Sequence, residues 1–437
     1  MDAERAVAPP VLAALTAACP ATREAGPGDA IAGILGVTPA FAASPSSTGE
    51  ASALLGAAAA HGLAVVPRGA GLGLGWGLPP TRCDLVVDLL AMDQVIEHAA
   101  GDLVARVQAG TTIGQLASVL AKAGQQLALD APADATVGGV VATGTAGPRR
   151  FRYGAPRDLL IGLTAVRADG VVAHSGGKVV KNVAGYDLGK LFSGSQGTLG
   201  LITEATFRLH PLPAAATYVT AEFGAADRAV TAAAVAAAAG SALVPSAVEL
   251  DWPAGSSRPL RVGVLLEGTA AGVAERATRM SELLGAAGGS PAVSVSQKAP
   301  ARWGTLPSSS SVIRATFWVG TLPGVLDAVT AAAADAGVRP AVSGPAGAGA
   351  LYACLGPRTE ADAAARFVRG LRDRLAGDPG VGPRGSVVVL TAPPQVLTAA
   401  GAYGQPGSVP GAALMRAVKD QFEPGYRMFP GRLAGGS

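Results

Sequence analysis

The 437-residue sequence predicts an α+β protein of two to three domains. Short apolar runs alternate with helical segments along the chain, which favours layers of strands and helices. The rhythm of this alternation changes after Pro211-Leu212-Pro213, which indicates a domain boundary. Hydrophobic residues make up 49% of the chain but aromatic residues only 4%, so we expect small side chains, alanine above all, to pack the core.

In the first part of the chain, turn and cap residues delimit the predicted elements. The polar stretch 44–50 supplies a turn and an N-cap for a helix that runs through His61 and ends at Gly62. A buried strand, Leu63–Val66, follows directly. Further helices are expected at 11–18 and 113–123, the latter stopped by Gly124, and further strands at 85–89, 103–109 and 205–209.

In the second part, two similar sets of strands and helices predict a ferredoxin-like cap. The expected strands are 218–223, 247–251, 261–267, 312–319, 350–355 and 387–390, and the expected helices are 225–239, 271–286, 323–336 and 360–376. The predicted organisation is an N-terminal helical extension at 1–26, a first domain at 27–212, the cap at 213–395 and a C-terminal return to the first domain at 408–437.

Composition excludes several classes of function. A net charge of +3 with 15% charged residues is too weak for a nucleic-acid-binding surface. The three cysteines, Cys19, Cys83 and Cys354, are far apart, which argues against a chain-borne iron–sulfur cluster or zinc site and fits a reducing compartment. No apolar stretch reaches the roughly 18–20 residues of a membrane-spanning helix. Asp2 and Glu4 stand where a signal peptide would be positive, so we expect a cytoplasmic protein, which partners could hold at the inner face of the membrane.

Two glycine-rich turns are the most informative feature of the chain. Residues 64–77 read AVVPRGAGLGLGWG, and residues 191–204 read LFSGSQGTLGLITE. Each follows or flanks an apolar run, and glycine lets peptide N–H groups converge on an oxyanion such as a phosphate. The alternating glycines fit neither the dinucleotide pattern G-x-G-x-x-G nor the phosphate-binding loop G-x-x-x-x-G-K-[ST]. Two such turns predict a diphosphate held from two sides.

The order of these motifs resembles the flavoproteins of the vanillyl-alcohol oxidase type. Residues 65–71, VVPRGAG, resemble the family's pyrophosphate loop, and DAP at 130–132 with TVGGVVATG at 136–144 resembles its second FAD segment. The residues GYDL at 185–188 and GSQGTLGLITE at 194–204 match the third. The resemblance covers roughly residues 27–212, with a return at FPGR, 429–432, where phenylalanine replaces the family's usual asparagine. It implies a two-part FAD-binding domain of the p-cresol methylhydroxylase (PCMH) type.

The resemblance also implies which residues contact FAD. They are Pro67, Arg68, Gly69, Ala70, Gly71, Leu72, Gly73 and Leu74 in the first loop, Pro132, Thr136, Val137, Gly138, Gly139, Ala142 and Thr143 in the second segment, and Gly197 and Ile202 in the third. Many family members bind FAD covalently through a histidine at the end of the first loop. Residues 74–77, LGWG, contain none, so we expect noncovalent FAD.

Within the family, residues 176–188, GGKVVKNVAGYDL, resemble the smaller, GlcE-type flavin subunit of bacterial glycolate oxidase. This implies an FAD-binding subunit that oxidises glycolate or another small 2-hydroxy acid together with a second flavin subunit and an iron–sulfur subunit. Lys181 and Tyr186 are candidates for binding a carboxylate or polarising the flavin, and Arg314 on a cap strand could face a carboxylate. No metal site is expected, because the stretch 342–350, where related dehydrogenases carry metal-binding histidines, has none.

Two alternatives stay open at the level of sequence. The first is a self-sufficient FAD-dependent oxidoreductase of a small hydroxy acid or alcohol. The second is a structural flavoprotein that stabilises a partner without redox turnover. Other interpretations of single residues also stand, since Tyr186 could simply pack and Asp187 could cap a helix.

Overall fold

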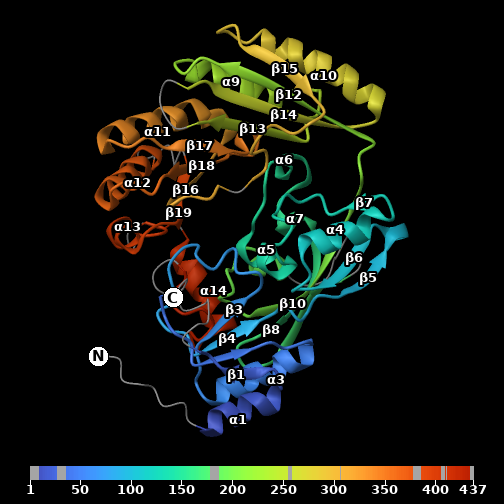
Figure 1. The fold of residues 1–437 in the computed structure, drawn as a ribbon, viewed down its shortest axis with the longest axis vertical. Helices are drawn as coiled ribbons and strands as arrows, with labels where there is room; N and C mark the ends of the chain where they lie inside the picture. Colours follow the sequence, from blue (N-terminus) through green and yellow to red (C-terminus); the bar gives the residue numbers. More distant parts are fainter. Residues whose placement is uncertain are drawn as a thin grey trace. The chain divides into compact units, whose positions relative to one another are not determined.

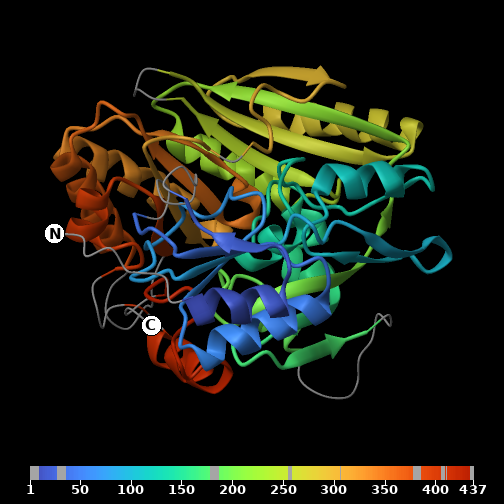
Figure 2. The ribbon, with the colours of Figure 1, turned by 60° about the horizontal axis from the view of Figure 1, so that its bottom comes forward.

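The computed structural model describes residues 9–26, 36–177, 187–253, 258–305, 307–376, 385–404, 409 and 411–433 (Figures 1 and 2). The chain forms two compact units. The first comprises the described parts of 1–145, 155–211 and 406–437, and the second those of 146–154 and 212–405. No helix in the described segments is both long enough and apolar enough to cross a lipid bilayer.

The first unit begins with a four-stranded sheet in the order β1-β2-β4-β3. β2 and β3 both pair with β4 in parallel, and β1 joins antiparallel. The packing of Leu54, Leu55 and Ala58 buries one side of the helix that connects β2 to β3, and its N-cap Ser47 accepts a hydrogen bond from the N–H of Glu50. The elements are α1 (Pro9–Ala18), β1 (Thr22–Glu24), β2 (Phe41–Ala43), α3 (Thr48–Ala60), β3 (Val65–Arg68) and β4 (Leu85–Asp88).

A second, antiparallel sheet of the first unit has the order β5-β6-β10-β8-β9. β10 is its central strand, so the chain that leaves the second glycine-rich turn enters the middle of this sheet. The strands are β5 (Val95–Ala99), β6 (Val104–Gln108), β8 (Leu160–Val166), β9 (Val172–Gly176) and β10 (Leu201–Arg208), with β7 (Gln125–Gln126) and β11 (His210–Pro211) forming a separate pair. The helices are η1 (Ala100–Asp102), α4 (Ile113–Ala121), α5 (Val137–Thr143), α7 (Pro156–Leu159), α8 (Gly189–Phe192) and α14 (Ala412–Phe422).

The second unit is an eight-stranded sheet in the order β15-β12-β14-β13-β17-β18-β16-β19. Each half follows the order strand–helix–strand–strand–helix–strand, so two ferredoxin-like halves join through β13 and β17. The first half contains β12 (Ala215–Phe223), α9 (Arg228–Ala239), β13 (Ala247–Trp252), β14 (Leu260–Gly268), α10 (Ala270–Gly285) and β15 (Ala292–Ser296). The second contains β16 (Ser311–Phe317), η2 (Val319–Thr321), α11 (Leu322–Ala336), β17 (Ala341–Gly344), η3 (Ala346–Ala348), β18 (Ala350–Leu355), α12 (Ala361–Leu375), β19 (Gly385–Thr391) and α13 (Pro394–Ala400).

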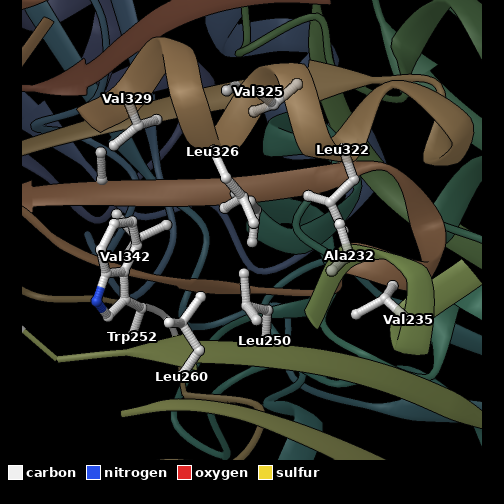
Figure 3. Close-up of a cluster of buried hydrophobic side chains, with 14 of the residues drawn as sticks. Ala232, Val235, Leu250, Trp252, Leu260, Leu322, Val325, Leu326, Val329 and Val342 are labelled. Atoms are coloured by element: carbon white, nitrogen blue, oxygen red, sulfur yellow. The ribbon is translucent and has the colours of Figure 1, made fainter. Parts of the chain in front are cut away.

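One core unites the two halves of this sheet. Leu250 of β13 and Leu260 of β14 face Leu326 of α11, and Val235 of α9 lies nearby (Figure 3). Along β13, the buried residues Val248, Leu250 and Trp252 alternate with half-buried Glu249 and Asp251 on the opposite face. A period of two is what a sheet with helices on one face requires. The predicted α+β class and the ferredoxin-like cap are therefore confirmed.

The structure differs from the sequence-based boundaries at residues 146–154, which the sequence assigns to the first domain and which pack with the second unit. They include α6 (Arg150–Tyr153). The Tyr153 hydroxyl donates to Glu267 at 3.1 Å, and the Arg152 guanidinium donates to the Val244 carbonyl at 3.3 Å. The sequence does not indicate that this short segment packs with the second unit, because its partners lie about a hundred residues further along the chain.

Leu326 offers a test of the shared core. Its side chain is fully buried, so Leu326→Ala should destabilise the second unit by about 2–5 kcal/mol, through lost burial and the cavity left behind. Val295→Ala is the control, since Val295 is 54% exposed on β15 of the same sheet. Calorimetric unfolding should show a clear drop in transition temperature for the first variant and almost none for the second. Equal shifts would contradict the description of the core.

Candidate cofactor site

The first glycine turn begins where β3 ends. Arg68, the last residue of β3, pairs with Asp88 of β4, its Nε donating at 3.0 Å. Its guanidinium is thereby used within the sheet. Beyond it the chain turns sharply: Gly71 has a φ of +83°, and the N–H of Leu74 donates to the Gly71 carbonyl at 3.1 Å. Leu74 is buried, which anchors the turn in the unit.

The peptide N–H groups of this turn are available to a ligand. Those of residues 69–73 have no acceptor anywhere in the described part of the chain. The neighbouring side chains of Ala70 and Leu72 are exposed and apolar, so they offer no competing acceptor. A row of unpaired backbone donors beside glycines is the chemistry that holds an anion such as a phosphate.

The second segment packs tightly against this turn. Thr136 caps the N-terminus of α5 by accepting from the N–H of Gly139. A Cβ on Gly69 would lie 2.1 Å from the Thr136 Oγ1, and a Cβ on Gly73 would lie 2.6 Å from the Thr143 Cγ2. Glycine is required at both positions because any side chain would push the turn away from α5.

The third segment joins the other two through its backbone. The N–H of Gln196 donates to the Ala142 carbonyl at 2.7 Å, and that of Gly194 donates to the Val141 carbonyl at 3.0 Å. Gly197 has a φ of +77°, and a Cβ there would lie 3.2 Å from the Pro67 Cγ. The two glycine-rich turns, which are more than a hundred residues apart in the sequence, therefore lie together.

The structure gathers nearly all the residues that the sequence predicts to contact FAD, and what each of them does to the cofactor stays a prediction. Ile202 follows the second glycine-rich turn, in β10. Its side chain is 5% exposed, and its backbone pairs with Ala165 of β8. Pro132 accepts from the N–H of Ala135 and so shapes the approach to Thr136. Lys181 and Tyr186 lie outside the described residues.

Arg314 lies in the second unit, on β16, directly across from Tyr352 of β18. It is half-buried, and its Nε has no acceptor within the described residues. Burial raises the pKa of the Tyr352 hydroxyl, and the nearby Arg314 and Arg150 partly oppose that rise. Arg314 and Tyr352 therefore form a polar pair on the face of the sheet opposite the hydrophobic core.

The same face borders a cavity of about 340 Å³ within the second unit. Tyr352, Glu249, Asp251, Arg302 and Trp303 are among the residues that line it. Burial raises the pKa of the Asp251 carboxyl above its usual range, and Arg302 and Arg261 work against that rise. The cavity thus combines acidic, basic and aromatic groups.

The sequence predicts that the C-terminal segment returns to the first domain, but it does not identify Lys419 and Arg432 as residues that brace the site. Lys419 of α14 is fully buried and donates to Glu423 at 2.6 Å, to the Thr198 carbonyl at 2.6 Å and to the Met428 carbonyl at 3.1 Å. Arg432 is 2% exposed. A lysine and a glutamate four residues apart on a helix usually form an ordinary surface pair, so the pattern gave no hint that this pair is buried.

Three of the four histidines have structural partners or lie at the surface. His98 contacts the Gln125 side chain at 2.9 Å, and His174 contacts the Thr164 hydroxyl at 3.1 Å. His61 ends helix α3 and is exposed. Within the described ranges, no three His, Cys, Asp or Glu side chains are grouped as a metal site would require.

Comparisons with known proteins agree with this geometry. Residues 39–176 match the family described as FAD binding domain. The chain is 40% identical over 176 residues to glycolate oxidase subunit GlcD of Bacillus subtilis, a match that spans 39% of this chain and 36% of that protein. It is 40% identical over 124 residues to glycolate oxidase subunit GlcE of Escherichia coli, spanning 28% of this chain and 35% of that protein. The matches thus cover about a third of the length of these curated relatives.

The solved structure of p-cresol methylhydroxylase with substrate bound superposes with a TM-score of 0.75 at 16% identity, covering 97% of this chain and 96% of that one. At this identity the likeness establishes the fold. Residues 39–176 therefore match the FAD binding domain family, and the chain has the fold of p-cresol methylhydroxylase.

Proposed function

We propose that this chain is the FAD-binding subunit of a dehydrogenase complex that oxidises glycolate or a related small 2-hydroxy acid. The observation that carries the proposal is the junction of three backbone segments at a row of unpaired N–H groups, in a chain that is similar to two glycolate oxidase subunits. In the complex, a second flavin subunit and an iron–sulfur subunit would take part in moving the electrons.

The residues present fit FAD. The free N–H groups of residues 69–73 would hold its diphosphate, and the glycines at 69 and 73 let α5 approach the same point. Bound FAD would supply the two-electron chemistry, since it can accept a hydride from a hydroxyl-bearing carbon. The protein would hold the cofactor through its backbone, while the charged side chain of Arg68 stays paired with Asp88.

A second candidate is favoured by the second unit, whose own cavity and whose Arg314–Tyr352 pair could bind a substrate carboxylate. In that case the chain would be a self-sufficient oxidoreductase. Arg314 would then bind the carboxylate through its guanidinium fork. Lys181 and Tyr186 stay proposals for the same purpose.

The absence of a histidine at residues 74–77 predicts noncovalent FAD. Purified protein should be yellow, and acid precipitation should release the colour into the supernatant. The measurement is an absorption spectrum before and after precipitation. If the colour stays in the pellet, FAD is covalently bound. If the protein is colourless and takes up no added FAD, the proposed function is wrong.

The close approach of Gly73 to α5 gives a sharper test. Gly73→Ala should weaken FAD binding by about 1–3 kcal/mol, because the added methyl group collides with the Thr143 methyl group. Thr143 is held in place because its hydroxyl donates to the Gly139 carbonyl at 2.8 Å. Fluorescence titration of the apoprotein with FAD measures the change.

Two further variants control this test. Thr143→Ser removes the colliding methyl group but keeps the hydroxyl, so the double variant with Gly73→Ala should recover most of the affinity. Gly75→Ala should change FAD affinity little, because a Cβ on Gly75 meets nothing within 4 Å. Failure of the rescue, or an equal loss for Gly75→Ala, would refute the proposed placement of the diphosphate.

The subunit role predicts that the isolated chain does not oxidise glycolate. With a dye as acceptor, glycolate should produce no turnover by the chain alone, whereas co-expression with the partner subunits should restore it. Photoreduced FAD on the chain should pass its electrons to the iron–sulfur partner. Saturable, glycolate-dependent reduction of the dye by the chain alone, abolished by Arg314→Met, would instead establish the self-sufficient enzyme.

A further inference from the structure

Arg432, near the C-terminus, contacts both glycine-rich turns with one side chain. Its Nη2 donates to the Gly73 carbonyl at 2.8 Å, and its Nη1 donates to the carbonyls of Leu74 at 2.9 Å and Leu78 at 3.0 Å. Its Nε donates to the side-chain oxygen of Gln196 at 2.9 Å. The guanidinium group lies 4.5 Å from the centre of the Phe429 ring, which supports it from one side.

The backbone around Arg432 is fixed to the same region. The N–H of Val65 in β3 donates to the Arg427 carbonyl at 2.7 Å, and the N–H of Phe429 donates back to the Val65 carbonyl at 2.8 Å. The N–H of Thr81 donates to the Pro430 carbonyl at 2.9 Å. The tail therefore holds Arg432 at a defined place beside the first turn.

These contacts determine which way the peptides at the C-terminal end of the turn point. In a trans peptide the carbonyl and the following N–H lie on opposite sides. With the carbonyls of Gly73 and Leu74 directed at Arg432, the N–H of Leu74 points away from it and closes the turn on the Gly71 carbonyl. The arginine thus fixes the C-terminal end of the turn from its carbonyl side, next to residues 69–73, whose N–H groups have no acceptor within the described residues.

The first turn needs such a brace because of its composition. Five of the nine residues 69–77 are glycine, and glycine loses more conformational freedom on ordering than any other residue. If the turn is flexible before the cofactor binds, the entropy lost when it becomes ordered reduces the affinity for the cofactor. The planar guanidinium of arginine has five N–H donors and can bind three carbonyls at once. The compact ammonium group of a lysine is less suited to this.

We propose that Arg432 is a positioning residue for the cofactor, which orders the first glycine turn so that its amides are ready for the FAD diphosphate. The inference rests on the proposed placement of that diphosphate at residues 69–73. It assigns to the C-terminal tail a role in cofactor affinity, in addition to any role in folding.

The chain contains an internal reporter of this order. Cys83 is 5% exposed and packs in a small cluster with Leu74 of the turn and Phe429 of the tail, and burial raises the pKa of its thiol to about 12. Cys354, in the second unit, is also buried, and burial raises the pKa of its thiol to about 11. Loosening of the turn should expose the first thiol and leave the second unchanged.

The test compares Arg432→Met with Arg427→Met in the full-length chain. Arg427 lies on the same tail and donates to the Ala168 carbonyl at 3.1 Å, away from the first turn. For Arg432→Met, the Kd for FAD should rise about tenfold or more, and the Kd for ADP should rise by a similar factor, since ADP carries the same diphosphate. In the apoprotein, the alkylation rate of Cys83 should rise against that of Cys354. Arg427→Met should leave the affinities and this ratio close to those of the wild type.

Each outcome separates the inference from the function on which it rests. A folded Arg432→Met protein with unchanged Kd values and an unchanged Cys83 rate would overturn the positioning role. If the wild type binds neither FAD nor ADP, the proposed function fails, and the Cys83 rate still decides whether Arg432 orders the turn. If Arg432→Met does not fold, Arg432→Lys takes its place: a Kd between wild type and a tenfold loss supports the proposal, and a wild-type Kd contradicts it.

Discussion

The buried ammonium group of Lys419 is the constraint on which the first unit depends. Removing a cation from water costs several kcal/mol unless its donors are all satisfied. Lys419 meets this demand through Glu423 and the carbonyls of Thr198 and Met428, even though burial lowers its pKa. Lys419 lies on α14, and its partners lie at the C-cap of α14, in the third segment and in the tail, so Lys419 fixes the relative positions of these segments. Met428 in turn forms a β-bridge with Val65 of β3, so the position of Lys419 is linked to that of β3.

The candidate cofactor site consists mainly of backbone, and this explains its glycine-rich sequence. Nearby charged side chains are paired within the sheets, as Arg68 is with Asp88 and Arg106 with Glu204. The charged group that contacts the turn is the guanidinium of Arg432, which donates to carbonyls of the turn, whereas Arg68 is paired within the sheet. Such a site needs close packing against the backbone of the turn, and the side chains of Thr136 and Thr143 leave no room for a Cβ on Gly69 or Gly73. The glycines thus serve packing as much as turning.

The second unit reaches its eight-stranded sheet by using one simple pattern twice. Each half buries one face of its strands under two helices, and α9 and α11 are rich in alanine, which lets helices approach closely. This buries the apolar face in a single core and leaves Glu249, Asp251 and Tyr352 on the other face, where the cavity lies. Because the core lies on the opposite face, substitutions among these polar residues should affect the stability of the fold little.

The sequence by itself determined the α+β class, the ferredoxin-like second unit and the segments that meet at the cofactor site. These depend on local signals: periodicity for the strands, a cap at Ser47, and glycines at fixed positions in the turns. The tertiary structure alone decided that residues 146–154 pack with the second unit, that Lys419 is buried, and that Arg432 holds the first turn. Each of these depends on partners far away in the chain, and neither the residue type nor its neighbours can reveal which distant carbonyl a lysine or an arginine will meet.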